Sequence, residues 1–178
     1  MDIRAARSAD VIGISKLVNL HAELGDVLPR TRTQIKATLS DWIVGSLNNE
    51  IVACVSLLNY NKNLAEVRSL IVSNQIQGMG WGAILLEAII SEAKHRKIPR
   101  IFALTREESF FERAGFLPSD RSHFPEKIWR DCDQCPVKDN CDEVAMELQL
   151  EKMPHLYKNS EQPDTFVLHQ NSKTLKEY

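Results

Sequence analysis

Residues 64–86 read Leu-Ala-Glu-Val-Arg-Ser-Leu-Ile-Val-Ser-Asn-Gln-Ile-Gln-Gly-Met-Gly-Trp-Gly-Ala-Ile-Leu-Leu, and this stretch decides the fold. A β-rich run breaks into a glycine-rich turn, and the turn opens an apolar helix. Glycines let a backbone approach a phosphate closely, and the first turn of a helix offers unpaired N–H groups with a favourable dipole. This order of elements predicts an anion-binding site over residues 77–82. The alternative is a glycine-rich turn that binds no ligand.

The turn has neither the G-x-G-x-x-G spacing of dinucleotide-binding folds nor the Gly-Lys-Ser/Thr of a P-loop. It resembles the acetyl-CoA pyrophosphate loop of the GCN5-related N-acetyltransferases, which is written Arg/Gln-x-x-Gly-x-Gly/Ala. Two registers fit this pattern, and they are Gln75, Gly78, Gly80 and Gln77, Gly80, Gly82. We favour the second register, because Leu85 and Leu86 then lie where the helix of this family carries its apolar pair.

The composition is ordinary for a globular protein. The chain has 178 residues, 43% hydrophobic and 26% charged, which is enough for one domain with a substantial core. Its net charge of −2 argues against a nucleic-acid partner bound by a broad basic surface. No apolar run approaches the ~20 residues that span a bilayer, and the N-terminus has no secretory signal. We therefore expect no membrane partner and a cytoplasmic location.

Hydrophobic periodicity over residues 1–150 predicts the element order β-α-α-β-β-β-α-β-α-β-β. Ser8 is a candidate cap for the first helix, and Thr31 or Thr33 for the second. Asn48-Asn49 reads as a hairpin turn before a strand over residues 50–60. Strict alternation over residues 64–72 puts Glu66, Arg68 and Leu70 on one face. The later elements are expected as a helix over 82–97, a strand over 100–104, a helix over 107–114, a strand from 116 and a strand over 143–150.

This order is that of the acetyltransferase family. The resemblance implies an α/β (α+β) fold with a central mixed, mostly antiparallel twisted sheet of about seven strands, flanked by helices. It also implies a cleft where the fourth and fifth strands splay apart. Residues 1–150 form the expected acetyltransferase domain, and residues 151–178 are expected to be a C-terminal tail or peripheral arm.

Five further segments, in their order along the chain, resemble the short, single-domain N-acetylglutamate synthases. This narrower resemblance implies an acetyltransferase that uses acetyl-CoA as cosubstrate and L-glutamate as its small-molecule substrate, in arginine biosynthesis. Two alternatives stay open: an acetyltransferase for another amino acid, a small amine or a protein N-terminus, and a non-catalytic acyl-CoA-binding regulatory module. The oligomeric state is also open, a homodimer included. The segments are 28–31 (Leu-Pro-Arg-Thr), 65–70 (Ala-Glu-Val-Arg-Ser-Leu), 102–105 (Phe-Ala-Leu-Thr), 110–116 (Phe-Phe-Glu-Arg-Ala-Gly-Phe) and 125–129 (Pro-Glu-Lys-Ile-Trp).

The resemblance also implies how CoA is held. Backbone groups of Leu70, Ile71 and Val72 would pair with the pantetheine arm, and the Leu70 N–H would face the thioester oxygen as an oxyanion donor. Phe111 stands where many family members carry a tyrosine acid, so it is expected to pack in the core and to wall the pantetheine channel. The expected pyrophosphate loop consists of Gln77, Gly78, Met79, Gly80, Trp81 and Gly82.

The acceptor needs a base for its amine and cations for its carboxylates. Glu66 is the candidate base, acting directly or through water, and the alternative is a structural pair with Arg68. Arg30 matches the glutamate-site arginine of the family by its Leu-Pro-Arg-Thr context, and the alternative is a solvated loop arginine. Arg68 and Lys127 are the second candidates for binding substrate.

Three of the four cysteines cluster late in the chain. Cys132-x-x-Cys135-x5-Cys141, with His123 upstream, could complete a Cys3His structural zinc site. Reduced thiols and a disulfide are the alternatives, and none of the three is needed for acetyl transfer. Cys54 lies in an apolar run and is expected to be a small core residue.

Overall fold

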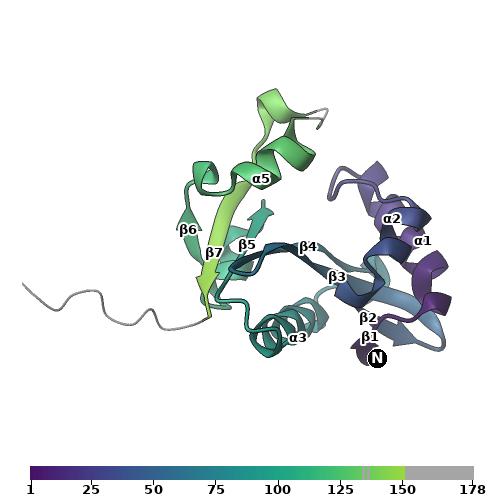
Figure 1. The fold of residues 1–178 in the computed structure, drawn as a ribbon. Coiled ribbons are helices and arrows are strands. Elements are labelled where there is room, and N and C mark those ends of the chain that lie inside the picture. The colour runs from purple at the N-terminus through teal and green to yellow at the C-terminus, as the bar shows by residue number, and fades with distance from the viewer. Residues whose placement is uncertain (134, 136, 151–178) are drawn as a thin grey trace, which may run out of the picture.

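The computed structural model describes residues 1–133, 135 and 137–150. Its strands are Asp2–Ala5 (β1), Trp42–Leu47 (β2), Glu50–Asn61 (β3), Leu64–Val72 (β4), Arg100–Thr105 (β5), Leu117–Ser119 (β6) and Val144–Gln149 (β7). They form one sheet in the order β1-β2-β3-β4-β5-β7-β6, in which only β4 and β5 pair in parallel. The mixed, mostly antiparallel sheet expected from the resemblance is thereby confirmed (Figure 1).

Helices cover both faces of this sheet. They are Val11–Glu23 (α1), Arg32–Ala37 (α2), Trp81–His95 (α3), Glu108–Glu112 (α4) and Pro125–Lys127 (α5), with a π-helix over Ile128–Cys132. Leu85, Leu86 and Ile89 of α3 are buried in the cluster on one face. Ile14 of α1 and Ile35 of α2 are buried in the cluster on the other face. Figure 1 shows α3 on the opposite side of the sheet from α1 and α2.

Several local predictions hold because side chains or turn geometry fix them. Asn48 and Asn49 have φ of 50° and 66°, as a two-residue hairpin turn between β2 and β3 requires. Thr31 caps α2 by accepting the N–H of Gln34 at 3.2 Å, so Thr33 is not the cap. The prediction for Ser8 is wrong, since Ser8 lies in a 3-10 turn over Ser8–Asp10 that precedes α1.

Strand β4 is interrupted by a β-bulge. Its partner register on β3 runs from Cys54↔Ile71 to Ser56↔Arg68, so β4 has one residue more than β3 between these pairs. Ser69 carries the irregularity, with φ of 51°, a region that few residues other than glycine adopt. As a result Leu70 packs against the same cluster as Val67, and the predicted shared face of Glu66, Arg68 and Leu70 is wrong for Leu70.

The bulged half of β4 also lacks a neighbour on its other edge. The parallel register with β5 contains two pairs, Ala65↔Ile101 and Glu66↔Phe102. Residues 67–72 therefore continue past the point where the two strands part. This confirms the splayed cleft between the fourth and fifth strands, and it places a free strand edge directly before the glycine turn.

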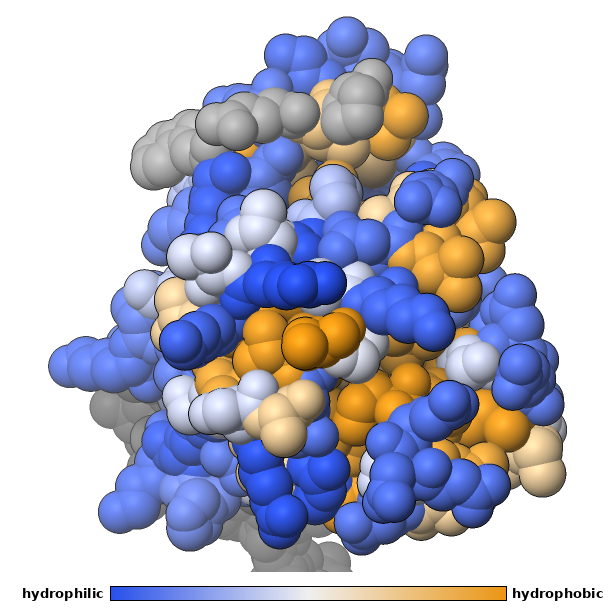
Figure 2. Space-filling view, turned by 90° about the vertical axis from the view of Figure 1, so that its right-hand side faces the viewer, coloured by the Kyte–Doolittle hydropathy of each residue, from blue (hydrophilic) through white to orange (hydrophobic). Residues whose placement is uncertain are grey.

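The side of the molecule that carries α1 and α2 is mostly hydrophilic, with apolar side chains gathered in its middle (Figure 2). Helix α1 contributes two of the exposed large apolar residues, Ile12 and Leu20, and Leu24 follows its last residue. In the part of the chain that the structure describes, no helix is both long and apolar enough to cross a membrane. The expected tail over residues 151–178 lies outside the described residues.

Candidate active site

A cleft of about 620 Å³ opens where β4 runs into the glycine turn and α3. Val72 from the end of β4, Gln77 from the turn and Leu86 from α3 line it, and Phe110 and Arg113 close it from the segment around α4. The anion-binding turn expected from the sequence therefore faces a cavity large enough for an extended ligand.

The turn has the backbone that an anion site needs. Gly78 and Gly80 have φ of 78° and 82°, and a Cβ placed on either would have no described atom within 4 Å beyond its own and the adjacent residues. Gly80 caps α3, and the first helical bond runs from Ile84 N–H to its carbonyl, which leaves the earlier N–H groups of the helix without helical partners. The Gln77 amide donates to the Val72 carbonyl at 3.0 Å and ties the turn to the strand.

The expected cofactor residues divide into two groups. Val72, Gln77, Gly78, Gly80, Trp81 and Gly82 line the cleft. Met79 is 66% exposed on the turn, and Ile71 is buried in the cluster beneath α1 and α2. Phe111 packs in the core against Phe116, with ring centroids 5.1 Å apart, and the cleft wall expected of it is formed by Phe110 instead.

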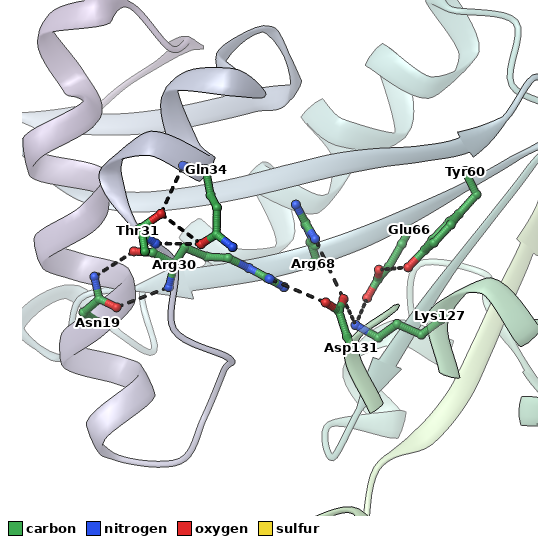
Figure 3. Close-up of polar contacts among 9 residues, drawn as sticks. All are labelled: Asn19, Arg30, Thr31, Gln34, Tyr60, Glu66, Arg68, Lys127 and Asp131. Atoms are coloured by element: carbon green, nitrogen blue, oxygen red, sulfur yellow. Dashed lines mark hydrogen bonds and ion pairs between the residues drawn. The ribbon is translucent and has the colours of Figure 1, made fainter. Parts of the chain in front are cut away.

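A second set of polar side chains meets where β4 and β5 part (Figure 3). Glu66, 2% exposed, has both carboxylate oxygens engaged. Oε1 pairs with Lys127 Nζ at 2.7 Å, and Oε2 accepts the Tyr60 hydroxyl at 2.8 Å. Its partners are therefore Lys127 and Tyr60, and not Arg68 as the structural alternative supposed.

Asp131 joins this pair to the two arginines. Its Oδ2 accepts Lys127 Nζ at 3.0 Å and lies 3.9 Å from Arg68 Nη1, while Oδ1 lies 3.6 Å from Arg30 Nη1. Arg30 enters from the loop before α2, Arg68 from β4, and Lys127 and Asp131 from the segment around α5 (Figure 3). The structure thus brings together all three substrate-binding residues expected from the sequence, and adds a carboxylate between them.

Burial and neighbouring charges together set the pKa values of these groups. Burial alone would raise the pKa of Asp131, but the charges of Lys127, Arg30 and Arg68 outweigh burial and lower it. Burial likewise opposes the charge of Lys127, but Glu66 and Asp131 outweigh it and raise the pKa of that ammonium. Burial lowers the pKa of Arg68, and the nearby Arg30 charge lowers it further. Asp131 is therefore a carboxylate and Lys127 an ammonium around neutral pH.

The arginines keep hydrogen-bonding capacity. Within the described residues, Arg30 Nε, Arg68 Nε and Arg68 Nη1 are buried and have no hydrogen-bond partner. Buried donors without acceptors are costly, and guanidinium donors match the two oxygens of a carboxylate. The pair is therefore prepared to receive an anion.

Local packing explains how the cluster is held. Asn19 of α1 clamps the backbone of Arg30, accepting its N–H at 3.2 Å and donating to its carbonyl at 3.0 Å. Phe124 stacks on Phe102 of β5 with centroids 4.0 Å apart, and its carbonyl accepts the Lys127 N–H, which seats α5 against the sheet.

Three residues of the site had no sequence signal. Tyr60 ends a strand that was expected, but its hydroxyl partner lies on the next strand. Asn19 reads as an ordinary helix residue, and Asp131 lies among several acidic residues of a cysteine-rich segment. Only contacts across the fold distinguish them.

The late cysteines do not form the zinc site that their spacing allowed. Among the described residues, no group of three His, Cys, Asp or Glu side chains could hold a metal ion. Cys132, Cys135 and Cys141 are free thiols, which also excludes the disulfide alternative in this structure. Cys141 Sγ accepts a hydrogen bond from Arg121 at 2.9 Å, so it takes part in local packing.

Comparison with known proteins shows which family the chain resembles in sequence. The model of the Acetyltransferase (GNAT) family matches residues 19–116. An uncharacterized N-acetyltransferase of Chlorobaculum tepidum is 34% identical over 144 residues, which cover 81% of this chain and 93% of that protein. An amino-acid acetyltransferase of Mannheimia succiniciproducens is 29% identical over 128 residues, or 71% of this chain and 29% of that protein.

A solved structure adds a likeness in three dimensions. The N-acetylglutamate synthase from Neisseria gonorrhoeae, complexed with coenzyme A and N-acetyl-glutamate, has a TM-score of 0.74 and 26% sequence identity. The likeness covers 85% of this chain and 35% of that one. The chain therefore spans about a third of the length of this synthase and of the amino-acid acetyltransferase.

Proposed function

Since the chain belongs to the GNAT family of acetyltransferases and is an N-acetyltransferase, we propose that it transfers the acetyl group of acetyl-CoA to the α-amine of L-glutamate. The observation that carries the choice of acceptor is the pair Arg30 and Arg68, whose buried guanidinium donors have no hydrogen-bond partner among the described residues. A substrate with carboxylates supplies the missing acceptors, and the bidentate geometry of arginine fixes its orientation.

Acetyl-CoA occupies the cleft along β4 and α3 in this proposal. The N–H groups at the start of α3 and the glycine turn hold the pyrophosphate, and Arg113 at the cleft wall adds a cation. The pantetheine arm lies along the strand edge of residues 67–72, which has no partner in the β5 register. The thioester then lies near the bulge at Ser69 and Leu70, where the Leu70 N–H stabilises the developing oxyanion.

The transfer itself needs a neutral amine. We assign removal of its proton to Glu66, directly or through water, because this carboxylate lies where β4 and β5 part. The amine nitrogen attacks the thioester carbonyl, the new C–N bond forms, and the C–S bond breaks to release CoA as thiolate. Phe111 occupies the position of the tyrosine acid, so the thiolate leaves without a dedicated acid from that motif.

Two relatives support an amino acid as the acceptor, and one of them supports glutamate. One is named an amino-acid acetyltransferase, and the Neisseria gonorrhoeae structure holds N-acetyl-glutamate. Both are about three times as long as the matched part, so their activities come to this chain only within this proposal.

A panel of the twenty amino acids, incubated with acetyl-CoA and followed by release of free thiol, tests it. We expect L-glutamate to give the fastest release. Faster release with another amino acid would replace the acceptor but keep the transferase. CoA binding without release for any amine tried would favour the regulatory acyl-CoA-binding module.

A further inference from the structure

We propose that Asp131 is a specificity-determining residue of the acceptor site, an internal counter-anion that occupies the arginine pair until a carboxylate of the acceptor displaces it. The inference rests on the proposed function in one respect: it takes Arg30 and Arg68 as the place where an acceptor carboxylate binds.

Asp131 makes one hydrogen bond and two longer ion pairs. Asp131 lies within hydrogen-bond distance of Lys127, at 3.0 Å. Its contacts to Arg30 and Arg68, at 3.6 and 3.9 Å, are ion pairs beyond that distance. Asp131 is therefore anchored on Lys127 and only neutralises the arginines. An incoming carboxylate can make the short, paired hydrogen bonds to guanidinium that Asp131 does not make.

The unpaired donors point to the same conclusion. Arg30 Nε, Arg68 Nε and Arg68 Nη1 are buried without an acceptor among the described residues, although the Asp131 side chain is itself only 9% exposed beside them. Asp131 is thus close enough to offset the charge of the arginines, yet it leaves their donors for another anion.

The charges of the cluster favour an acidic amino acid. Arg30, Arg68 and Lys127 face Glu66 and Asp131, which leaves one positive charge in excess among the groups that pair directly. An amino dicarboxylate in its usual form carries one net negative charge and matches this excess. Acetylation removes the ammonium charge, so the product is a dianion. The fixed charge of Asp131 then opposes retention of the product and favours its release.

The position of Asp131 suits displacement from the arginines. It lies in the π-helix that follows α5, where the Asp133 N–H bonds the Ile128 carbonyl five residues back at 2.9 Å. Such wide turns recur at functional sites. Lys127 lies four residues earlier on the same segment, so Asp131 keeps this partner while the arginines take the substrate.

Asp131→Asn tests the inference, with Asp133→Asn as the matched control. Both variants remove one negative charge from the same segment, but Asp133 is exposed and contacts neither arginine in the structure. Calorimetry measures binding of glutarate, a dicarboxylate that lacks the amine and does not react. We expect Asp131→Asn to bind glutarate about tenfold more tightly than wild type, and Asp133→Asn to bind it like wild type.

Kinetics give a second readout that loss of packing alone would not produce. In Asp131→Asn the KM for L-glutamate and the inhibition constant of N-acetylglutamate should both fall, while kcat falls because product leaves slowly. The KM for acetyl-CoA should stay unchanged. Should Asp131→Asn not fold, Asp131→Glu keeps the charge and extends it toward the arginines, and we expect it to weaken glutarate binding.

Glutarate binding in Asp131→Asn that is unchanged or weaker, in protein that binds CoA like wild type, would overturn the inference. So would unchanged binding in Asp131→Glu. The glutarate measurement needs no turnover, so its expected result can be found even where the amino-acid panel shows that L-glutamate is not the acceptor. That combination defeats the proposed function alone. Conversely, acetylation of glutamate together with unchanged glutarate binding defeats the inference alone.

Discussion

Arg30 reaches the acceptor site from a loop that is fixed through its backbone. Asn19 bonds both the N–H and the carbonyl of residue 30, so Arg30→Ala removes the guanidinium and leaves the clamp in place. We expect the KM for L-glutamate to rise roughly 10–150-fold, because a charge-assisted pair is worth ~1.5–3 kcal/mol. The KM for acetyl-CoA should change little.

Arg32→Ala is the matched control for this variant. Arg32 is exposed at the first position of α2, two residues beyond Arg30, and has the same charge. Steady-state kinetics on both variants distinguish a direct contact of Arg30 with the substrate from the general electrostatic effect of removing one positive charge. Equal effects of the two substitutions on the KM for glutamate would argue against Arg30 as a substrate-binding residue.

Glu66 poses a different question, because both of its oxygens already have partners. If Glu66 takes the proton of the amine, Glu66→Gln lowers kcat most at low pH and is partly rescued as pH rises. The reason is that more of the acceptor amine is already neutral at high pH. The check is a profile of kcat between pH 6.5 and 9, and a profile parallel to wild type would make Glu66 a structural partner of Lys127.

Some residues of the site could be predicted from the sequence and others could not. Arg30, Arg68 and Lys127 were predicted because their motifs resemble those of a family with an acidic substrate. Asp131 and Tyr60 were not, since what singles them out is proximity to residues distant in the chain. Asp131 is 65 residues from Glu66, and its segment is held near β4 by the packing of Phe124 on Phe102 and by the pair of Lys127 with Glu66.

At the scale of elements, we propose that the strand, glycine turn and helix over residues 64–95 bind CoA. Gly80→Asp places a negative charge beside the expected pyrophosphate, at a residue with φ of 82°. We expect calorimetry to show CoA affinity reduced at least tenfold, the size of one lost charge-assisted contact of ~1.5 kcal/mol.

A second glycine with positive φ, Gly25, controls for the loss of stability that a side chain causes at such a backbone conformation. Gly25 follows α1 with φ of 81°, and like Gly80 it has no atom within 4 Å of a Cβ. Gly25→Asp should lose comparable stability in thermal unfolding, yet bind CoA like wild type. CoA binding that is unchanged in Gly80→Asp would remove the loop from the site.

Elements with strong local signals were predicted well. The Asn48-Asn49 hairpin and the Thr31 cap follow from turn and capping chemistry that acts within four residues. The bulge of β4 was not predicted, because serine carries no signal for the positive φ that Ser69 adopts. Its consequence is that Leu70 packs on the same side of the sheet as α3.

At the scale of the whole molecule, the charged cluster connects the N-terminal helices to the segment around α5 across the sheet (Figure 3). The pKa of Asp131 is lowered in the folded protein, so its contribution to stability is present above the ordinary Asp value of 3.8 and is lost as pH falls through the lower folded value. Asp131→Asn should therefore be less stable than wild type at pH 7, and the difference should shrink below about pH 4.

Lys127 titrates in the opposite sense. Its pKa is raised, so its contribution to stability is present below the ordinary value of 10.5 and is lost as pH rises through the higher folded value.

Urea unfolding of wild type and Asp131→Asn between pH 3 and 8 measures the predicted loss of the Asp131 contribution at low pH. A stability difference that stays constant over this range would show that Asp131 is not linked to folding through its charge.

We propose that this protein selects L-glutamate among amines. This selectivity is tested most directly by competition, in which an equimolar mixture of the twenty amino acids reacts with limiting acetyl-CoA and the acetylated products are quantified by mass spectrometry. Product ratios in such a mixture report ratios of kcat/KM. We expect N-acetylglutamate to predominate over every other product, N-acetylglutamine and N-acetylaspartate included. A mixture in which another acetylated amino acid predominates would contradict it.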